Sequence, residues 1–254
     1  MPIPAKTIDE VLAELDLIID STVKENNFLG IFAYVYRRTT AQIKQAILEQ
    51  QFEDNARMEV LDVAFANLYL TAFHSYATTK NCSASWQAAF SAKHEKITIL
   101  QHVMLGMNAH INLDLGIAAA TIAPGEELAV IKNDFMKVNQ ILSDLTNEMQ
   151  HRVSKVSRLM FILDWTGNNT DEKIINFSMV KAREQAWNLA CVLSESNENE
   201  IKSVVEVTDR TIAALGAILK NPPGKLLKIA LKAVAYFEEK NVKTIIHKLQ
   251  EDKA

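Results

Sequence analysis

Residues 54–72, DNARMEVLDVAFANLYLTA, carry the pattern on which the fold prediction depends most. Asp54 is a residue type that caps helix N-termini, because its side chain accepts a hydrogen bond from a free backbone N–H of the first turn. Apolar side chains then recur at intervals of three and four residues, the spacing of one face of an α-helix. They are Met58, Leu61, Phe65, Leu68 and Ala72. The stretch therefore predicts an amphipathic helix that buries one face.

The same spacing continues toward the N-terminus. The T-x-x-E pattern of Thr7 and Glu10 predicts a capping box at the start of the first helix, which we expect to end near 26–27. After an aromatic segment that is apolar on all sides, Thr39 or Thr40 is expected to cap a new helix.

Helical spacing also continues toward the C-terminus, with the clearest breaks at Pro124-Gly125 and at 222–224 and further turns at 166–169 and 197–199. The expected segments are a loop at 78–85 that ends in the N-cap Ser85, one long helix over 93–122, helices over 143–163 and 171–194, a helix that ends near 220, and a Lys-rich helix with a break near Asn241. No window alternates with a period of two. The sequence therefore predicts an all-α, single-domain bundle (1–254) of about eight to ten helices without a sheet, with its core in 28–193 and the helices of 198–254 packed on it.

The composition excludes some classes of function. A net charge of −4 argues against a nucleic-acid partner, because such proteins usually carry a basic face. The N-terminal residues lack the apolar run of a signal peptide, and two cysteines do not make a disulfide framework, so we expect a cytoplasmic protein. The composition identifies no cofactor and no oligomeric state.

The most unusual segment runs over 100–116, LQHVMLGMNAHINLDLG, and places polar side chains in an otherwise apolar helix. His110 and Asp114 are four residues apart and can therefore form a hydrogen bond. Asn108 and Asn112 make a second pair with the same spacing on a different face. Buried polar groups must find partners, so both pairs are candidates for structure or for function.

Three interpretations of this segment stay open. In the first, the side chains form a buried network that fixes the register of the helix. In the second, His110 is a catalytic acid or base and Asp114 holds its tautomer. In the third, His102, His110 and Asp114 bind a transition metal, but the usual H-E-x-x-H pattern is missing and we expect no metal.

Two arginines are further candidates for ligand binding. Arg37 follows the aromatic segment and could clamp a carboxylate or phosphate, or else form a structural salt bridge with Glu59 or Asp62. Arg183 and Trp187 are four residues apart and could stack as a cation–π pair.

Two other patterns are more typical of ordinary surfaces. Glu148 and His151 make one E-x-x-H, whereas a di-iron bundle requires two such motifs, so we expect no di-iron centre. Lys225, Lys228 and Lys232 form a basic stripe, as in helices that lie on anionic membranes. The apolar residues expected opposite this stripe are Leu226, Leu227, Ile229, Ala230 and Ala233. Because the chain as a whole is acidic, we expect a solvated face and no membrane partner.

Three motifs resemble a bacterial family, the domain-of-unknown-function family numbered 5995. The segment 106–115, GMNAHINLDL, resembles the signature of that family, and the similarity spans roughly 28–193. Its second block resembles 52–59 with Phe65-Ala66-x-x-Tyr69, and its third resembles Ala182-Arg183-x-x-Ala186-Trp187. The resemblance implies an all-helical fold and a bacterial setting, and it brings no activity or cofactor.

Two hypotheses of function follow. In one, the protein is an enzyme or binding protein that holds a small molecule in a pocket between helices, lined by the aromatic segment from Phe32 to Tyr36. Its candidate residues are His110 and Asp114 as the acid–base pair, with Asn108, Asn112, Arg37, Tyr34 and Arg183 as ligand-binding groups. In the other, the protein is a scaffold in which the same polar residues are sealed and mutually satisfied. Solvent access to His110 separates the two.

Overall fold

The structure is a computed structural model that describes residues 3–138, 141 and 179–250. These residues are mostly helical and contain no strand, which confirms the all-α prediction. Eleven α-helices have their bounds there: α1 (Ile8–Lys24), α2 (Leu29–Leu48), α3 (Asn55–Thr79), α4 (Ala84–Ser91), α5 (Ile99–Ala109), α6 (Leu115–Ile122), α7 (Glu127–Val130), α11 (Met179–Glu195), α12 (Glu198–Lys220), α13 (Lys225–Phe237) and α14 (Val242–Gln250). A 3₁₀ turn (η1, Ala92–His94) follows α4, and a π-helical turn (η2, His110–Asp114) joins α5 to α6.

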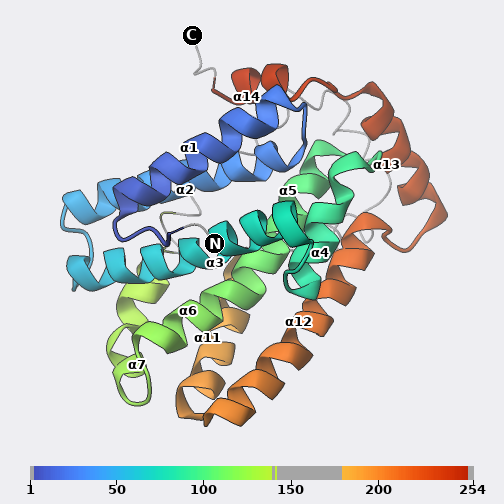
Figure 1. Ribbon diagram of the computed structural model, residues 1–254. Coiled ribbons are helices and arrows are strands. Elements are labelled where there is room, and N and C mark those ends of the chain that lie inside the picture. The colour runs from blue at the N-terminus through green and yellow to red at the C-terminus, as the bar shows by residue number, and fades with distance from the viewer. Residues whose placement is uncertain (1–2, 139–140, 142–178, 251–254) are drawn as a thin grey trace.

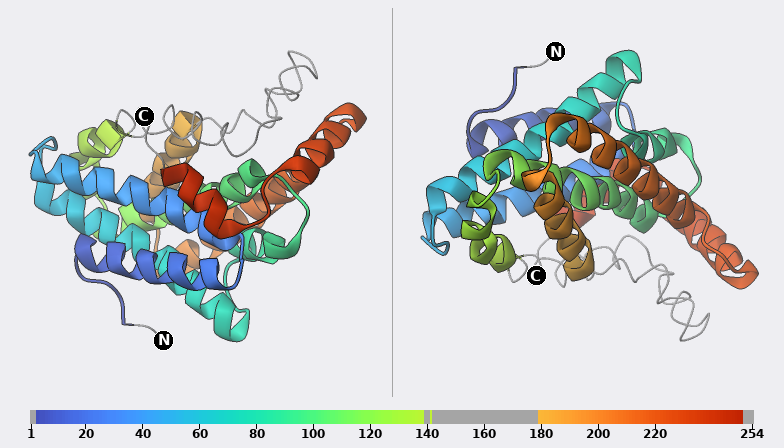
Figure 2. Two further views of the ribbon diagram at one scale, coloured as in Figure 1. Left: turned by 90° about the horizontal axis from the view of Figure 1, so that it is seen from above. Right: turned by 90° about the horizontal axis from the view of Figure 1, so that it is seen from below.

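The helices are arranged so that α5, η2 and α6 contact several others. Figure 1 shows α1 and α2 side by side, with α14 against them. α6 packs on α3 and α11, whereas α5 packs on α2, α4 and α12. Figures 1 and 2 show α13 at the edge of the molecule, beyond the end of α12. The residues of α5, η2 and α6 are mostly buried, so this continuous run lies in the interior of the molecule.

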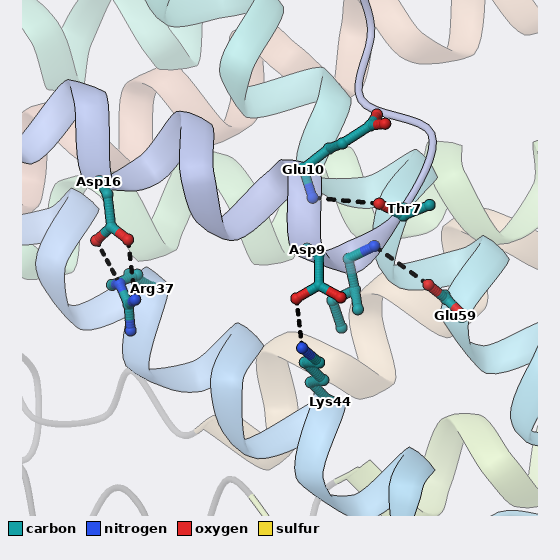
Figure 3. Close-up of polar contacts among 8 residues, drawn as sticks. Thr7, Asp9, Glu10, Asp16, Arg37, Lys44 and Glu59 are labelled. Atoms are coloured by element: carbon teal, nitrogen blue, oxygen red, sulfur yellow. Dashed lines mark hydrogen bonds and ion pairs between the residues drawn. The ribbon is translucent and has the colours of Figure 1, made fainter.

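The predicted N-caps of α1 and α3 are largely confirmed. The Thr7 hydroxyl accepts a hydrogen bond from the backbone N–H of Glu10 (Figure 3), and Asp54 accepts one from Arg57 N. The Glu10 carboxylate, however, accepts from Lys6 N rather than from Thr7 N, so only half of the expected capping box forms.

The prediction of a new helix at Thr39 or Thr40 is wrong. α2 continues through both residues, and the Thr39 hydroxyl donates to the carbonyl of Val35 inside the helix. A threonine is able to remain in a helix in this way, because its hydroxyl bonds back to the preceding turn instead of capping.

The boundaries around α4 and α5 also differ from the prediction. Ser83, not Ser85, caps α4, and the carboxylate of Asp209 on α12 accepts from Ala84 N and Ser85 N. The expected single helix over 93–122 instead begins at Ile99, after a capping box made by Thr98 and Gln101. Sequence spacing alone could not show the cap from Asp209, which lies more than a hundred residues away.

The C-terminal expectations are confirmed where the structure describes them. Helix α12 ends at Lys220, and the break near Asn241 separates α13 from α14. The predicted helix over 143–163 and the start of the one expected at 171 lie outside the described residues. Within the described part of the chain, no helix is both long and apolar enough to cross a membrane.

Candidate functional site

The His110–Asp114 pair lies in a π-helical turn between two α-helices. Leu115 N donates to His110 O, five residues earlier, so this turn contains one more residue than an α-turn. Single π-turns inside α-helices occur frequently at functional sites, because they are retained in spite of their poorer hydrogen-bond geometry. All five residues of the turn are buried.

The Asp114 carboxylate holds two donors at one oxygen. Its Oδ2 lies 3.0 Å from His110 Nδ1 and accepts a hydrogen bond of 2.9 Å from Trp86 Nε1. Two donors at one oxygen favour the ionised carboxylate and a proton on His110 Nδ1. In that state His110 Nε2 carries the lone pair and is the basic atom of the ring.

Aromatic rings enclose the imidazole. Phe65 stacks on it with ring centroids 3.6 Å apart and an interplanar angle of 7°, and Tyr36 meets it edge-on at 4.5 Å. Phe32, Tyr69 and Trp86 complete the enclosure at about 6 Å, with centroid distances of 6.1, 5.9 and 5.9 Å. The side chain of His110 is therefore closed off from bulk solvent, at 2% exposure.

Several polar atoms around His110 have no partner. His110 Nε2, Tyr36 Oη, Tyr69 Oη and Asp62 Oδ2 are buried without a hydrogen bond to any described residue. The Thr40 hydroxyl lies near Tyr36, but neither hydroxyl makes a hydrogen bond of normal geometry. Leaving a buried polar group unsatisfied costs on the order of 1–3 kcal/mol, so a cluster of four is a large departure from ordinary packing.

Burial also shifts the ionisation of these groups toward their neutral forms. It lowers the pKa of His110 and raises that of Asp114, although the hydrogen bond between them opposes both shifts. Burial, with a smaller effect of Glu59, raises the pKa of Asp62 to about 7. Burial and the charge of Asp62 raise the pKa of Tyr36. The cluster thus contains one carboxyl group, that of Asp62, whose pKa lies near neutral pH.

The two asparagines predicted as ligand-binding residues lie on another side of the helix. Asn108 Nδ2 donates to the carbonyl of Ile212 on α12 at 2.9 Å, and Asn112 Nδ2 donates to Asn108 Oδ1 at 3.1 Å. The structure therefore brings these two residues together with α12 and not with His110.

Arg37 and Tyr34 also lie away from the cluster. Figure 3 shows Arg37 of α2 facing Asp16 of α1, where Nε and an Nη donate to the two carboxylate oxygens. The expected salt-bridge partners Glu59 and Asp62 are therefore wrong for this arginine. Tyr34 donates to the carbonyl of Leu249 and so attaches α14 to α2.

Arg183 is buried beside a different ring from the one expected. Its guanidinium lies 4.5 Å from the centroid of Phe135 and donates to the Phe135 carbonyl at 2.5 Å. The aromatic partner is therefore Phe135 and not Trp187, although the two rings are themselves 5.0 Å apart. Burial lowers the pKa of Arg183 to about 9.

His102 does not join the other two candidate metal ligands. Its ring packs 4.9 Å from that of Phe28, and burial lowers its pKa to about 4. Within the described residues, no three His, Cys, Asp or Glu side chains come together in a group able to hold a metal ion. The E-x-x-H of Glu148 and His151 lies outside the described residues.

The cluster includes residues that the sequence reasoning did not select. Trp86 was not singled out, and Asp62 was named only as a salt-bridge partner of Arg37, because nothing local in the sequence shows their place in the cluster. Tyr36 ends the aromatic segment that was expected to line the pocket, and it does lie beside His110. Phe65 and Tyr69 belong to the second block of the family resemblance, and their spacing on α3 was the available signal.

Comparison with known proteins identifies the family. Residues 8–222 match a family described as a family of unknown function (DUF5995), a range that contains the whole cluster and ends before α13. Neither the curated proteins nor the solved structures gave a match.

Proposed function

The chain belongs to the DUF5995 family, and we propose that it binds a small polar molecule between α2, α3 and η2, where His110 Nε2 exchanges a proton with it. One observation carries this proposal: His110 Nε2, Tyr36 Oη, Tyr69 Oη and Asp62 Oδ2 are all buried without partners among the described residues. A ligand with donors and acceptors would satisfy these atoms together.

Each residue has a role in the proposal. Asp114 and Trp86 hold the imidazole in the Nδ1–H tautomer, so that Nε2 is the base. Tyr36 and Tyr69 offer hydroxyl groups to the ligand, and Asp62 offers a carboxyl whose pKa of about 7 allows either protonation state. Stacked Phe65 fixes the plane of the imidazole. The ligand is therefore small and polar, and it enters when the aromatic enclosure opens.

The burial of the cluster favours a second candidate, a purely structural network. His110 and Asp114 are 2% and 4% exposed, as expected for a scaffold. A scaffold of this kind also requires mutual satisfaction, and only the Asp114 carboxylate has its partners. The first candidate is better supported, because it accounts for the four unsatisfied atoms.

The cellular compartment of the protein is also part of what we propose. We place the protein in the bacterial cytoplasm, and the free thiols of Cys82 and Cys191 support a reducing compartment. A small metabolite of that compartment is then the class of ligand to look for.

Native mass spectrometry of the purified protein tests the proposal directly. The wild-type protein should retain a small molecule in addition to its own mass, and denaturing chromatography should release it for identification. His110→Gln and Tyr69→Phe should each lose this added mass while remaining folded by circular dichroism.

His102→Gln is the matched control. His102 is also a buried histidine whose Nε2 has no partner among the described residues, but it lies beside Phe28 and outside the cluster. This variant should retain the molecule. If wild-type protein carries no added mass, and the His110 ring stays neutral and unperturbed from pH 5 to 8 in NMR titrations, the structural network is the correct candidate.

A further inference from the structure

The outward face of α13 combines exposed apolar and basic side chains. Leu226, Ile229, Tyr236 and Phe237 are 71%, 64%, 78% and 69% exposed. At about 100° per residue they lie on one flank of the helix, together with Ala233. Elsewhere in the described chain, exposed large apolar residues are more scattered, and single ones are ordinary on protein surfaces. Four within one short helix indicate a surface with a partner.

The adjoining flank of α13 is basic. Lys225, Lys228 and Lys232 are all exposed, and none of them has an ion pair with a described residue. The opposite face, with Leu227, Leu231 and other apolar residues, is buried against the rest of the protein. The helix therefore packs one face against the protein core and presents a separate apolar and basic face to the surroundings.

The charge of this region is opposite to that of the rest of the protein. Residues 220–250 contain seven Lys and two Glu, which gives +5. The whole chain carries −4, so the other residues carry −9. The matched family range ends at residue 222, so nearly all of this basic region lies beyond it.

We propose that the outward face of α13 docks on an anionic phospholipid bilayer, with the apolar side chains inserted and the lysines at the headgroups. The combination of apolar insertion, aromatic residues at one end and flanking lysines is what such a surface binds. A second copy of the chain fits less well, because an antiparallel pairing of this face with itself would place the two lysine flanks against each other, and a parallel pairing would leave both flanks without an acidic partner. The sequence pattern alone favoured a solvated face, because it could not show that these four apolar side chains point away from the core.

Sedimentation with vesicles tests this proposal on the full-length protein. Binding to vesicles of phosphatidylcholine mixed with phosphatidylglycerol should exceed binding to phosphatidylcholine alone, and high salt should weaken it. Replacing both Lys228 and Lys232 by Gln should weaken binding by about fivefold per lysine. Replacing both Ile229 and Phe237 by Gln should weaken binding at every salt concentration.

Matched pairs of exposed residues on other helices and turns serve as controls. The pair Leu17→Gln and Val207→Gln repeats the loss of two exposed apolar side chains, and the pair Lys132→Gln and Lys202→Gln repeats the loss of two exposed charges. Both control proteins should bind as the wild type does.

Three outcomes would overturn the proposal. In the first, the wild-type protein fails to sediment with anionic vesicles at low salt. In the second, the two α13 double variants bind as tightly as their controls. In the third, sedimentation equilibrium shows a dimer that only the Ile229 and Phe237 double variant disrupts, and this result would assign the face to a second copy of the chain.

Discussion

Two pairs of polar residues, each with a spacing of four, lie in one stretch of helix. They differ in whether all their buried polar atoms have hydrogen-bond partners. Asn108 and Asn112 bond to each other and to the Ile212 carbonyl, and neither leaves a buried atom without a partner. His110 and Asp114 bond to each other and to Trp86, but His110 Nε2 stays open. A satisfied pair is explained by the packing of helices, whereas an open one requires another explanation.

The largest effect is expected from removal of the Asp114 carboxylate. Asp114→Ala leaves Trp86 Nε1 and His110 Nδ1 buried without an acceptor, and breaking a buried pair of this kind costs about 3–5 kcal/mol. Urea unfolding measures the loss. Asp114→Asn keeps one acceptor oxygen and should cost less, and equal losses for the two variants would show that the acceptor is not what stabilises this turn.

The asparagine pair should show a smaller effect that is confined to stability. Asn108→Ala removes the bond to Ile212 O and leaves Asn112 Nδ2 without its partner, at a cost of about 1–3 kcal/mol. The small molecule that we expect to be bound should still appear in native mass spectra. Loss of that molecule at unchanged stability would break the distinction between the two pairs.

Asp62 should make stability depend on pH. An unfolded Asp titrates near pH 4, and burial raises the folded-state pKa to about 7. The folded state therefore binds the proton more tightly, and this contribution to stability, complete below about pH 4, is lost as the pH rises toward 7. Relative to Asp62→Asn, the wild type should lose about 2 kcal/mol between pH 5 and 7.5.

Urea unfolding of both proteins at several pH values measures this difference. Asp20→Asn, on the exposed face of α1, is the control for replacing an aspartate by its amide. Parallel pH profiles for the wild type and Asp62→Asn would show that Asp62 has a partner in solution that neutralises the effect of burial.

The smallest effect on stability is expected at Tyr69. Its hydroxyl is buried without a partner among the described residues, so Tyr69→Phe should change the free energy of unfolding by less than about 0.5 kcal/mol or even raise it. The same change should abolish retention of the small molecule. A loss of more than about 1 kcal/mol would mean that the hydroxyl is already satisfied within the protein.

Local spacing predicted much of this fold but only the centre of the site. The helical period and the caps at Thr7 and Asp54 are short-range signals, and the structure confirms them. The hydrogen bond between His110 and Asp114 also follows from a spacing of four residues. By contrast, Trp86 of α4 reaches Asp114 through a contact between helices, Asp62 of α3 lies near Tyr36 of α2, and the cap that Asp209 provides for α4 crosses more than a hundred residues. No periodicity contains such information.

The arginines show a second limit of the sequence. A guanidinium in a buried-looking segment suggests an anion site, but the groups that the fold places beside it decide its role. Arg37 meets Asp16 across two neighbouring helices, and Arg183 meets the carbonyl and ring of Phe135. Both partners depend on helix packing, which the spacing of residues along the chain does not determine.

The π-turn also changes which sides of the continuous helix from Ile99 to Ile122 contact the neighbouring helices. The one added residue rotates all later side chains by about 100° around the helix axis. The side of α5 that contacts α2, α4 and α12 is therefore no longer aligned with the side of α6 that contacts α3 and α11. One continuous helix can thereby contact two groups of helices that lie in different directions. Deleting one residue from the turn would align the contact sides of α5 and α6 again, and one of the two would no longer face the helices on which it now packs.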